Sequence, residues 1–503
     1  MQTLWQILRN RARTLLKNPG LMLIVMITIM LTPGVGANTA VFSVAGATGQ
    51  SSGGPLDPKE LEQFLDGFLA EHFEKERIPG AAFIMVKDGK IFFKKGYGFA
   101  NLARQQRVSP DSTIFRIGSI SKVFTADAVM QLADRGAIDL NVDVNQYLKR
   151  VKVPATFTEH VTAAHLISHT AGFDEIRPGT QAPEREDVLP LADFLRPRLV
   201  RLWRPGQIHM YSTYGMTLAG ALVEDVSGAS IEDYMAKNIW RPLGMERTNI
   251  TVPPKLADDV AIGYEYVESA KTQQPQKWEW YHTTPASSIN STAADMAVWM
   301  IAHLQNGQYG DAQIFSERAA REMLRTHATG HPKLHGLAYG FAEEMYGELR
   351  LLEHGGNMAG FSSQVVLIPE RNAGFFLVNQ HEDSQLRDHL KWAILERYYG
   401  PPRKASVPSP APDFNTRAHL FAGKYGSATY CHTCQGRQPG LTFQVTSNAD
   451  GSISLNGKRW IEVEPLLFVR EDGSSKIAFR ADALGRITHM FFGGGWTFEK
   501  LMP

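Results

Sequence analysis

Hydrophobic positions follow three different patterns along this chain of 503 residues. Residues 21–31 are almost continuously apolar, whereas residues 416–503 alternate short hydrophobic and polar runs. Between them lie apolar runs of intermediate length, including residues 218–226, 364–369 and 373–379. In chain order, the patterns predict a segment that could cross a membrane or act as a signal peptide, a core of helices and buried strands, and a β domain.

The middle of the chain combines a predicted helix with predicted strands. Residues 218–226 are expected to be helical and to end at Ser227-Gly228, because glycine commonly follows the last helical residue. Residues 349–352 look like a strand, and residues 364–369 and 373–379 have the length and composition of buried antiparallel strands.

The last part of the chain predicts a small all-β domain, either a barrel or a curled sheet. Its alternating runs are separated by Asp-Gly, Asn-Gly and Gly-Gly pairs, which favour tight hairpin turns. The predicted strands are residues 441–445, 452–456, 466–470, 476–480 and 487–492.

The N-terminal segment differs from that of an ordinary soluble enzyme. No acidic residue occurs before Asp57, and residues 32–45 extend the apolar stretch to the roughly 20 residues that cross a bilayer. Two alternatives follow: a single membrane anchor with the rest of the chain facing outward, or a cleaved signal that releases it. Residues 16–21 and 34–44 also resemble the first membrane helix of bacterial permeases of the macrolide-exporter type, which implies a bacterial inner membrane with the rest of the chain in the periplasm. The basic flank holds Arg9, Arg11, Arg13 and Lys17.

Composition narrows the classes of function. With 43% hydrophobic and 20% charged residues, the chain has the make-up of a globular protein of two or three domains. Lys and Arg (52) nearly balance Asp and Glu (51), so the chain lacks the basic excess typical of nucleic-acid-binding proteins, and no nucleic-acid partner is expected. The sequence predicts no particular oligomeric state.

Ser119 and Lys122 have a Ser-x-x-Lys spacing that can supply a nucleophile and its base. If Gly118 ends a turn and a helix begins near Ser119, both side chains stand on one helical face within hydrogen-bond reach. The helix start would also direct backbone N–H groups toward the serine, where acyl transfer creates negative charge. Ordinary residue frequencies produce roughly one such spacing by chance in a chain of this length, so the pair is informative only together with other motifs.

Two later segments accompany this pair. One is a tyrosine on a loop just before the helix predicted at residues 218–226, and the other is a glycine-flanked strand edge after residues 349–352. The residues concerned are Tyr211, Ser212 and Thr213 in the first segment and His354, Gly355 and Gly356 in the second.

In this order the motifs resemble those of the serine β-lactamase and penicillin-binding-protein superfamily, and most of all its branch of class C β-lactamases, esterases and D-aminopeptidases. The likeness runs from about residue 61 to residue 399. It implies an α+β fold, with an antiparallel sheet flanked by helices, a helical subdomain and an active site between them. It also implies a serine hydrolase that forms an acyl-enzyme and needs no cofactor. The substrate is a separate question, and small esters, amides or peptides are expected. Other segments that carry it are residues 78–83, 166–173, 240–245 and 285–295.

With this resemblance, the chain divides into six predicted regions. The C-terminal one resembles, by pattern, the lipocalin-like modules of some related hydrolases, and is expected either to pack on the enzyme or gate its substrate, or to bind a ligand of its own. The regions are a basic cytoplasmic segment (1–19), a membrane anchor or signal (20–45), a linker (46–58), the hydrolase domain (59–400), a proline-rich linker (401–415) and the β-barrel-like domain (416–503).

Two side chains compete for the role of general base. Lys122 in water would be protonated, because its reference pKa of about 10.4 lies some three units above neutral pH, and Tyr211, near 10, faces a similar penalty. Burial can lower the first, and a nearby ammonium can lower the second. The resemblance implies that the two act as one proton-shuttling unit.

The resemblance also assigns an oxyanion site to the backbone N–H groups of Ser119 and Asn357. Two residues depart from the family pattern. His354 stands where a lysine is usual, so the site lacks a fixed positive charge for a β-lactam carboxylate, and Thr213 stands where an asparagine is usual. Both changes favour ester or small peptide-like substrates over efficient β-lactam hydrolysis. Alternatives are β-lactamase, D-aminopeptidase or DD-peptidase activity, or a non-catalytic member that binds peptides or peptidoglycan.

Cysteine and histidine spacings suggest no further chemistry. Cys431 and Cys434 are the only cysteines, and outside the cytoplasm a local disulfide that braces a turn is the expected state. His331 and His335 have a metal-like spacing, but Pro332 would break the helix that aligns them, so no metal site is predicted.

Overall fold

The computed structural model describes residues 53–175, 178–382, 384–401, 409 and 413–501. The predicted basic segment (1–19) and the anchor or signal (20–45) lie outside these residues, as does most of the predicted linker 401–415. Within the described part of the chain, no helix is both long and apolar enough to span a membrane.

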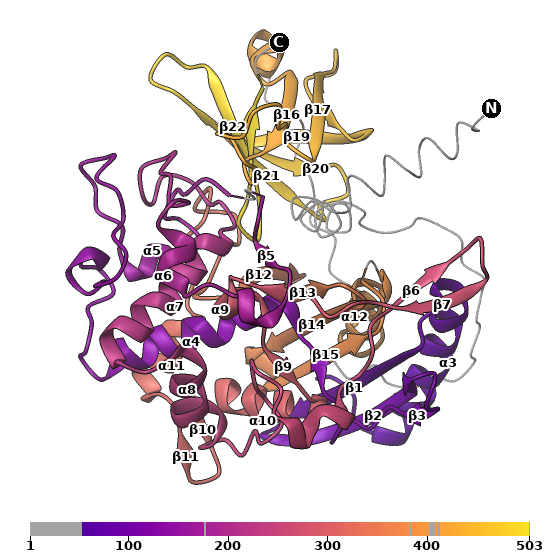
Figure 1. Cartoon of the computed structure of the whole chain (residues 1–503). Coiled ribbons are helices and arrows are strands. Elements are labelled where there is room, and N and C mark those ends of the chain that lie inside the picture. Colours follow the sequence, from indigo (N-terminus) through magenta and orange to yellow (C-terminus); the bar gives the residue numbers. More distant parts are fainter. Residues whose placement is uncertain (1–52, 176–177, 383, 402–408, 410–412, 502–503) are drawn as a thin grey trace.

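A seven-stranded antiparallel sheet lies beside the helical part of the chain and below the barrel in Figure 1. Its strand order is β12-β13-β14-β15-β1-β2-β3, so β1 from the start of the domain pairs with β15 from its end, with Phe83 opposite Leu377. The strands are β1 (Gly80–Lys87), β2 (Lys90–Asn101), β3 (Gln106–Arg107), β12 (Ala342–Tyr346), β13 (Leu349–Met358), β14 (Phe361–Ile368) and β15 (Ala373–Asn379).

Both faces of the central strands β1, β14 and β15 are buried, which explains their continuous apolar runs. Alternate residues of β1 belong to different cores: Ala82, Ile84 and Val86 join the large core, and Ala81, Phe83 and Met85 join a second one. Helices α3 (Pro58–Glu76) and α12 (Leu386–Tyr399) cover the second face, while α10 (Ala293–Leu304) packs on the first.

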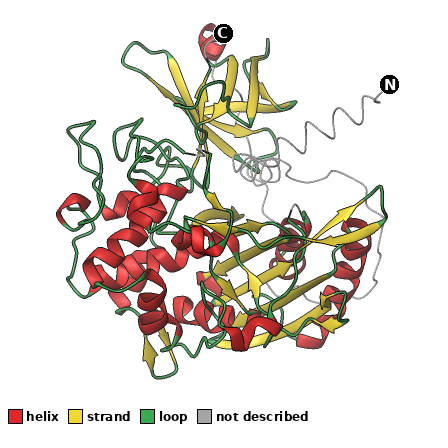
Figure 2. Cartoon of the chain, in the orientation of Figure 1, coloured by secondary structure: helices red, strands yellow, loops and turns green. Residues whose placement is uncertain are grey.

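A helical subdomain packs beside the sheet and shares its large core (Figure 2). At its centre α4 is buried on almost every side and packs against α7. The helices are α4 (Ser121–Asp134), α5 (Ala163–Ile167), α6 (Leu191–Leu195), α7 (Thr213–Ser227), α8 (Ile231–Met235), α9 (Thr284–Ser287) and α11 (Glu317–Leu324). Short strand pairs are β4 (Phe115–Arg116) with β9 (Asn290–Ser291), β5 (Gln181–Ala182) with β8 (Trp280–Tyr281), β6 (Tyr264–Val267) with β7 (Thr272–Pro275), and β10 (Gln308–Tyr309) with β11 (Ala312–Gln313).

The C-terminal domain is a closed eight-stranded barrel that begins after the short helix α13 (Phe414–Arg417). The predicted fold class, a helix-and-sheet domain followed by a small all-β domain, is therefore confirmed. Three barrel strands, β16, β19 and β23, have no counterpart in the alternating runs of the sequence. The strands are β16 (Gly423–Ser427), β17 (Thr442–Ser447), β18 (Ile453–Leu455), β19 (Lys458–Glu464), β20 (Leu467–Arg470), β21 (Lys476–Ala481), β22 (Ile487–Phe492) and β23 (Trp496–Lys500).

The barrel lies above the rest of the chain in Figure 1, and it contacts the loop that leads into α7. Ile208 and Met210 of that loop form one apolar cluster with barrel residues such as Phe491, and the ring of Tyr211 packs against the barrel core. Arg480 of β21 donates to the carbonyl of Gln207 at 2.6 Å. The barrel is thus joined to the segment that carries the predicted catalytic tyrosine.

A disulfide between Cys431 and Cys434 braces the barrel loop that touches the helical subdomain. The carboxylate of Asp174 accepts hydrogen bonds from the backbone N–H of His432 at 2.8 Å and from that of Thr433 at 3.2 Å. Asp174 is fully buried by this contact.

Candidate active site

Ser119 and Lys122 lie at the start of the central helix, as the sequence predicts. Gly118 has a φ of 55°, which favours glycine, and opens a 3₁₀ turn (Gly118–Ile120) that continues into α4. The Lys122 Nζ lies 3.0 Å from the Ser119 Oγ. Ser119 is half-buried, whereas Lys122 is only 1% exposed. Ser119 is thus partly exposed, whereas the amine of Lys122 is shielded from water.

Burial changes the chemistry of Lys122. Its Nζ also donates to the carbonyl of Ala286 at 2.9 Å and lies 4.9 Å from the ring centre of Tyr211. Desolvation lowers the pKa of Lys122 to about 7, and the nearby carboxylate of Glu175 opposes the shift. A large fraction of the lysine is therefore neutral near pH 7.

Tyr211 lies immediately before α7, whose first turn is capped by the Ser212 hydroxyl on the N–H of Gly215 at 2.8 Å. The helix begins at Thr213, earlier than the predicted residue 218, because polar residues at a capped helix start hide the apolar pattern. Burial raises the pKa of Tyr211, and a hydrogen bond with Ser119 acts in the opposite direction. The phenol is therefore protonated at neutral pH.

The strand edge beside the serine is β13. Its pairing with β12 ends at Glu353, so residues 354–358 pair with β14 alone and leave one edge for the 3₁₀ turn. Gly356 makes this approach possible, because a Cβ there would lie 2.0 Å from the carbonyl oxygen of Ile117. A Cβ on Gly118 would lie 2.9 Å from the Asn357 nitrogen. The backbones of Gly118 and Asn357 are thus in close contact.

His354 is a neutral side chain in this arrangement. Its Nδ1–H donates to the carbonyl of Gly355 at 2.7 Å, and its ring centre lies 6.2 Å from that of Tyr211. Burial, together with the nearby Lys122, lowers the pKa of His354 to about 3. Thr213 is the first residue of α7 and is only half-buried.

Comparison with known proteins identifies the family. The profile of the beta-lactamase family matches residues 62–399. This chain belongs to the beta-lactamase family. The predicted resemblance to the β-lactamase and penicillin-binding-protein superfamily is thereby confirmed, and membership is consistent with serine hydrolase activity.

Two relatives of this beta-lactamase family member share about a quarter of its residues over the matched segments. The protein flp of Staphylococcus aureus (strain N315) is 26% identical over 342 residues, which cover 67% of each chain. A beta-lactamase of Escherichia coli (strain K12) is 27% identical over 254 residues, covering 49% of this chain and 62% of that protein.

Two solved structures share the fold at low sequence identity. The octameric penicillin-binding protein homologue from Pyrococcus abyssi is 21% identical, with a TM-score of 0.58 over 87% of this chain and 100% of that one. SurE is 22% identical, with a TM-score of 0.63 over 88% of this chain and 100% of that one.

Glu175, which the sequence does not indicate as a site residue, places a buried carboxylate against the first turn of α7. Its Oε1 accepts from the N–H of Tyr214 at 2.9 Å and from the Ser212 hydroxyl at 2.5 Å. Burial raises the pKa of Glu175 to about 7, while these hydrogen bonds oppose the rise. The acidic pair Asp174-Glu175 directly follows the family-like segment 166–173, but nothing in the sequence indicates that it faces Lys122.

Two more residues hold parts of the site in place, one beside Tyr211 and one beside Asn357. His169 accepts from the N–H of Ser212 at 3.1 Å, and its ring centre lies 4.7 Å from that of Tyr211. Arg387, on α12, donates to the Asn357 side-chain oxygen at 2.7 Å and to the Gly356 carbonyl at 3.1 Å. It lies far along the chain from the residues that it holds, so no local motif predicts it.

Proposed function

We propose that this protein is a serine hydrolase that forms an acyl-enzyme on Ser119. One observation carries the proposal: the Lys122 Nζ lies 3.0 Å from the Ser119 Oγ, and burial lowers the pKa of this lysine to about 7. When the amine is neutral, its lone pair accepts the serine proton as Oγ attacks a carbonyl.

Tyr211 would complete the proton path. Its phenol is hydrogen-bonded to Ser119 and remains protonated, so it can give a proton to the leaving group while Lys122 replenishes it. The buried tyrosine is a poorer base than the neutral lysine, because a phenolate without water is more costly than a neutral amine. We therefore assign the base of acylation to Lys122, acting as one coupled unit with Tyr211.

The tetrahedral intermediate needs hydrogen-bond donors for its oxyanion. We assign this role to the backbone N–H groups of Ser119 and Asn357, supported by the close contact between Gly118 and the Asn357 backbone. Removing one donor of this kind commonly costs about 10²–10³-fold in kcat.

Small carboxylic esters, and small amides or peptides, are the substrates that the site favours. His354 is neutral, so no fixed charge stands where a β-lactam carboxylate would need one. The second candidate is hydrolysis of D-amino-acid amides or β-lactams, which membership of the beta-lactamase family supports.

Turnover by the purified full-length protein tests the proposal. The substrates are p-nitrophenyl butyrate, D-alanine p-nitroanilide and nitrocefin, and the ester is expected to be hydrolysed fastest. Ser119→Ala should lower ester hydrolysis by at least about 10³-fold without unfolding the protein. Ser227→Ala, at an exposed serine, is the matched control and should hydrolyse the ester normally. Unchanged turnover by Ser119→Ala would exclude the mechanism, whereas a preference for nitrocefin or the anilide would change only the substrate class.

We also propose that the hydrolase acts outside the cytoplasm. The disulfide between Cys431 and Cys434 suits an oxidising compartment, and the predicted anchor or signal at residues 20–45 would direct export. Cell fractionation followed by intact-mass measurement tests this, because a cleaved signal yields a soluble chain that lacks the N-terminal residues. Full-length protein in the cytoplasmic fraction would contradict export.

A further inference from the structure

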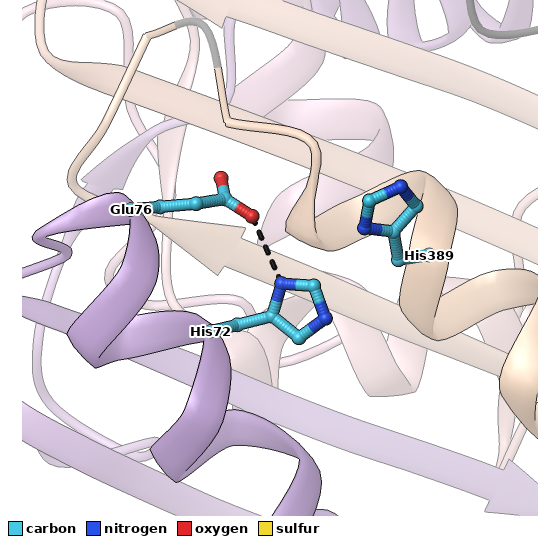
Figure 3. Close-up of side chains that lie close together, drawn as sticks. All are labelled: His72, Glu76 and His389. Carbon is cyan, nitrogen blue, oxygen red and sulfur yellow. Dashed lines mark hydrogen bonds and ion pairs between the residues drawn. The ribbon is translucent and has the colours of Figure 1, made fainter. Parts of the chain in front are cut away.

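Three side chains of types that bind metals lie close together between helices α3 and α12 (Figure 3). These helices cover the face of the sheet opposite α10. His72 and Glu76 lie one turn apart near the end of α3, and His389 lies in the first turn of α12. One ligand atom from each residue lies within 4.8 Å of the other two. Ser119 belongs to the opposite side of the sheet, so this cluster is separate from the candidate active site.

The three side chains converge on a common gap (Figure 3). Atoms within 4.8 Å of one another have a central point at most about 2.8 Å from each, whereas zinc bonds nitrogen and oxygen at about 2.0–2.2 Å. Rotations that move each side-chain tip by less than about 1 Å therefore close the site. His72 Nδ1 and Glu76 Oε1 are already 2.9 Å apart, which is close to the spacing of two ligands on one ion.

The surroundings hold the ligands in this orientation. The second carboxylate oxygen of Glu76 accepts from the Ser384 hydroxyl and from the Gln385 N–H, both at 2.9 Å, so Oε1 remains directed at the histidines. The ring of Phe68 stacks on His72 with centres 4.6 Å apart. Hydrogen bonds and packing that orient the ligands are typical of metal sites in proteins.

We propose that His72, Glu76 and His389 form a divalent transition-metal site, with Zn²⁺ as the best-fitting ion, that fastens α3 to α12. Two imidazoles and one carboxylate suit Zn²⁺, whereas Mg²⁺ and Ca²⁺ prefer oxygen ligands alone. Three protein ligands leave a fourth position for water. The ion stiffens the start of α12, which carries Arg387 and so contacts the strand of Asn357.

Metal titration of the chelator-treated full-length protein tests this site without any reference to hydrolysis. Calorimetry with ZnCl₂ should show one saturable site per chain, and Zn²⁺ should raise the temperature of unfolding. His389→Ala should weaken this binding by about tenfold or more and remove the rise in unfolding temperature. His419→Ala, at an exposed histidine outside the cluster, is the matched control and should bind like the wild type.

A second variant and a second ion distinguish the loss of the metal site from a folding defect in His389→Ala. His389→Gln removes the imidazole but keeps a side chain of similar length, and it should also lose the site. Co²⁺ in the wild-type protein should give the visible absorption of a four-coordinate ion, which His389→Gln should lack. The absence of saturable Zn²⁺ binding, or equal affinity in the wild type and both His389 variants, would overturn the proposal.

Discussion

At the residue scale, the candidate site depends on two ionisable groups whose pKa values are shifted in opposite directions by burial. Desolvation makes Lys122 a better proton acceptor at neutral pH and makes Tyr211 a worse one. The titratable groups around the lysine amine are Tyr211, Glu175, His169 and His354. Both histidines have pKa values well below neutral, so the carboxylate of Glu175 is the neighbour that can counter the shift of Lys122.

The pH profile of hydrolysis follows from this environment. Below its pKa, Lys122 is protonated and cannot accept the serine proton, so kcat/KM should fall about tenfold per pH unit there and level off above about pH 7. Steady-state hydrolysis of the p-nitrophenyl ester between pH 5 and 9 measures the profile. A rate that is flat through this range would show that Lys122 is not the base.

Glu175→Gln tests the influence of the carboxylate on the lysine. Because burial raises the pKa of Glu175 to about 7, this carboxylate is only partly charged in the pH range where Lys122 titrates. Removing its negative charge lowers the pKa of Lys122 further, so the acid limb of kcat/KM should move to lower pH. The glutamine oxygen can still accept from the Tyr214 N–H, so the start of α7 should persist. A purely structural role would reduce stability and leave the midpoint of the profile unmoved.

The sequence predicts the residues of the site better than their surroundings. Ser119, Lys122, Tyr211 and the His354 segment can be predicted because they belong to local motifs with fixed spacing. Glu175 and Arg387 cannot, because their roles arise from contacts between segments that lie far apart along the chain.

At the element scale, strand β13 and the 3₁₀ turn lie so close together that a side chain at either point of contact would not fit. Gly356 of β13 and Gly118 of the turn provide this contact, because neither carries a Cβ. The sequence indicates a strand at residues 349–352 with a glycine-flanked edge after it. In the structure β13 continues to Met358, beyond the predicted residues. Polar and glycine residues in its second half conceal the strand pattern.

Gly356→Ala should break this contact. The added methyl would meet the Ile117 carbonyl at 2.0 Å, which should lower the free energy of unfolding by about 1–3 kcal/mol. The displaced strand should also lower kcat by about 10²-fold. Gly67→Ala is the matched control, since a Cβ there meets nothing within 4 Å and alanine favours the helix. Urea unfolding and ester hydrolysis measure both effects, and normal activity in Gly356→Ala would contradict the account.

At the scale of the whole molecule, the barrel takes part in building the site. Asp174 binds the disulfide-braced loop of the barrel, and the next residue, Glu175, holds the start of α7. The sequence predicts a small all-β domain, either a barrel or a curled sheet, and five of the eight barrel strands. It does not predict where the barrel rests, because that depends on matching surfaces such as Phe491 against Met210.

His432 makes the barrel contact sensitive to pH. Although burial lowers its pKa, hydrogen bonds with Asp174 and Glu499 raise the pKa of His432 to about 9. Protonated His432 therefore stabilises the fold fully below about pH 6.5, and this contribution is lost as the pH rises through about 9. This rise in pKa corresponds to at most about 3 kcal/mol, because solvent screens the partly exposed pair. Unfolding experiments should show a stability difference between wild type and His432→Gln that shrinks from pH 6.5 to 9.5, and a constant difference would contradict the assignment.

The most direct test of the central claim is covalent labelling of the nucleophile. Wild-type protein treated with a fluorophosphonate should gain one adduct by intact-mass spectrometry, and peptide mapping should locate it on Ser119. Ser119→Ala should gain none, and Lys122→Ala should label far more slowly, because it has lost the amine that accepts the serine proton. An adduct on another residue, or no adduct on a folded wild-type chain, would contradict the account.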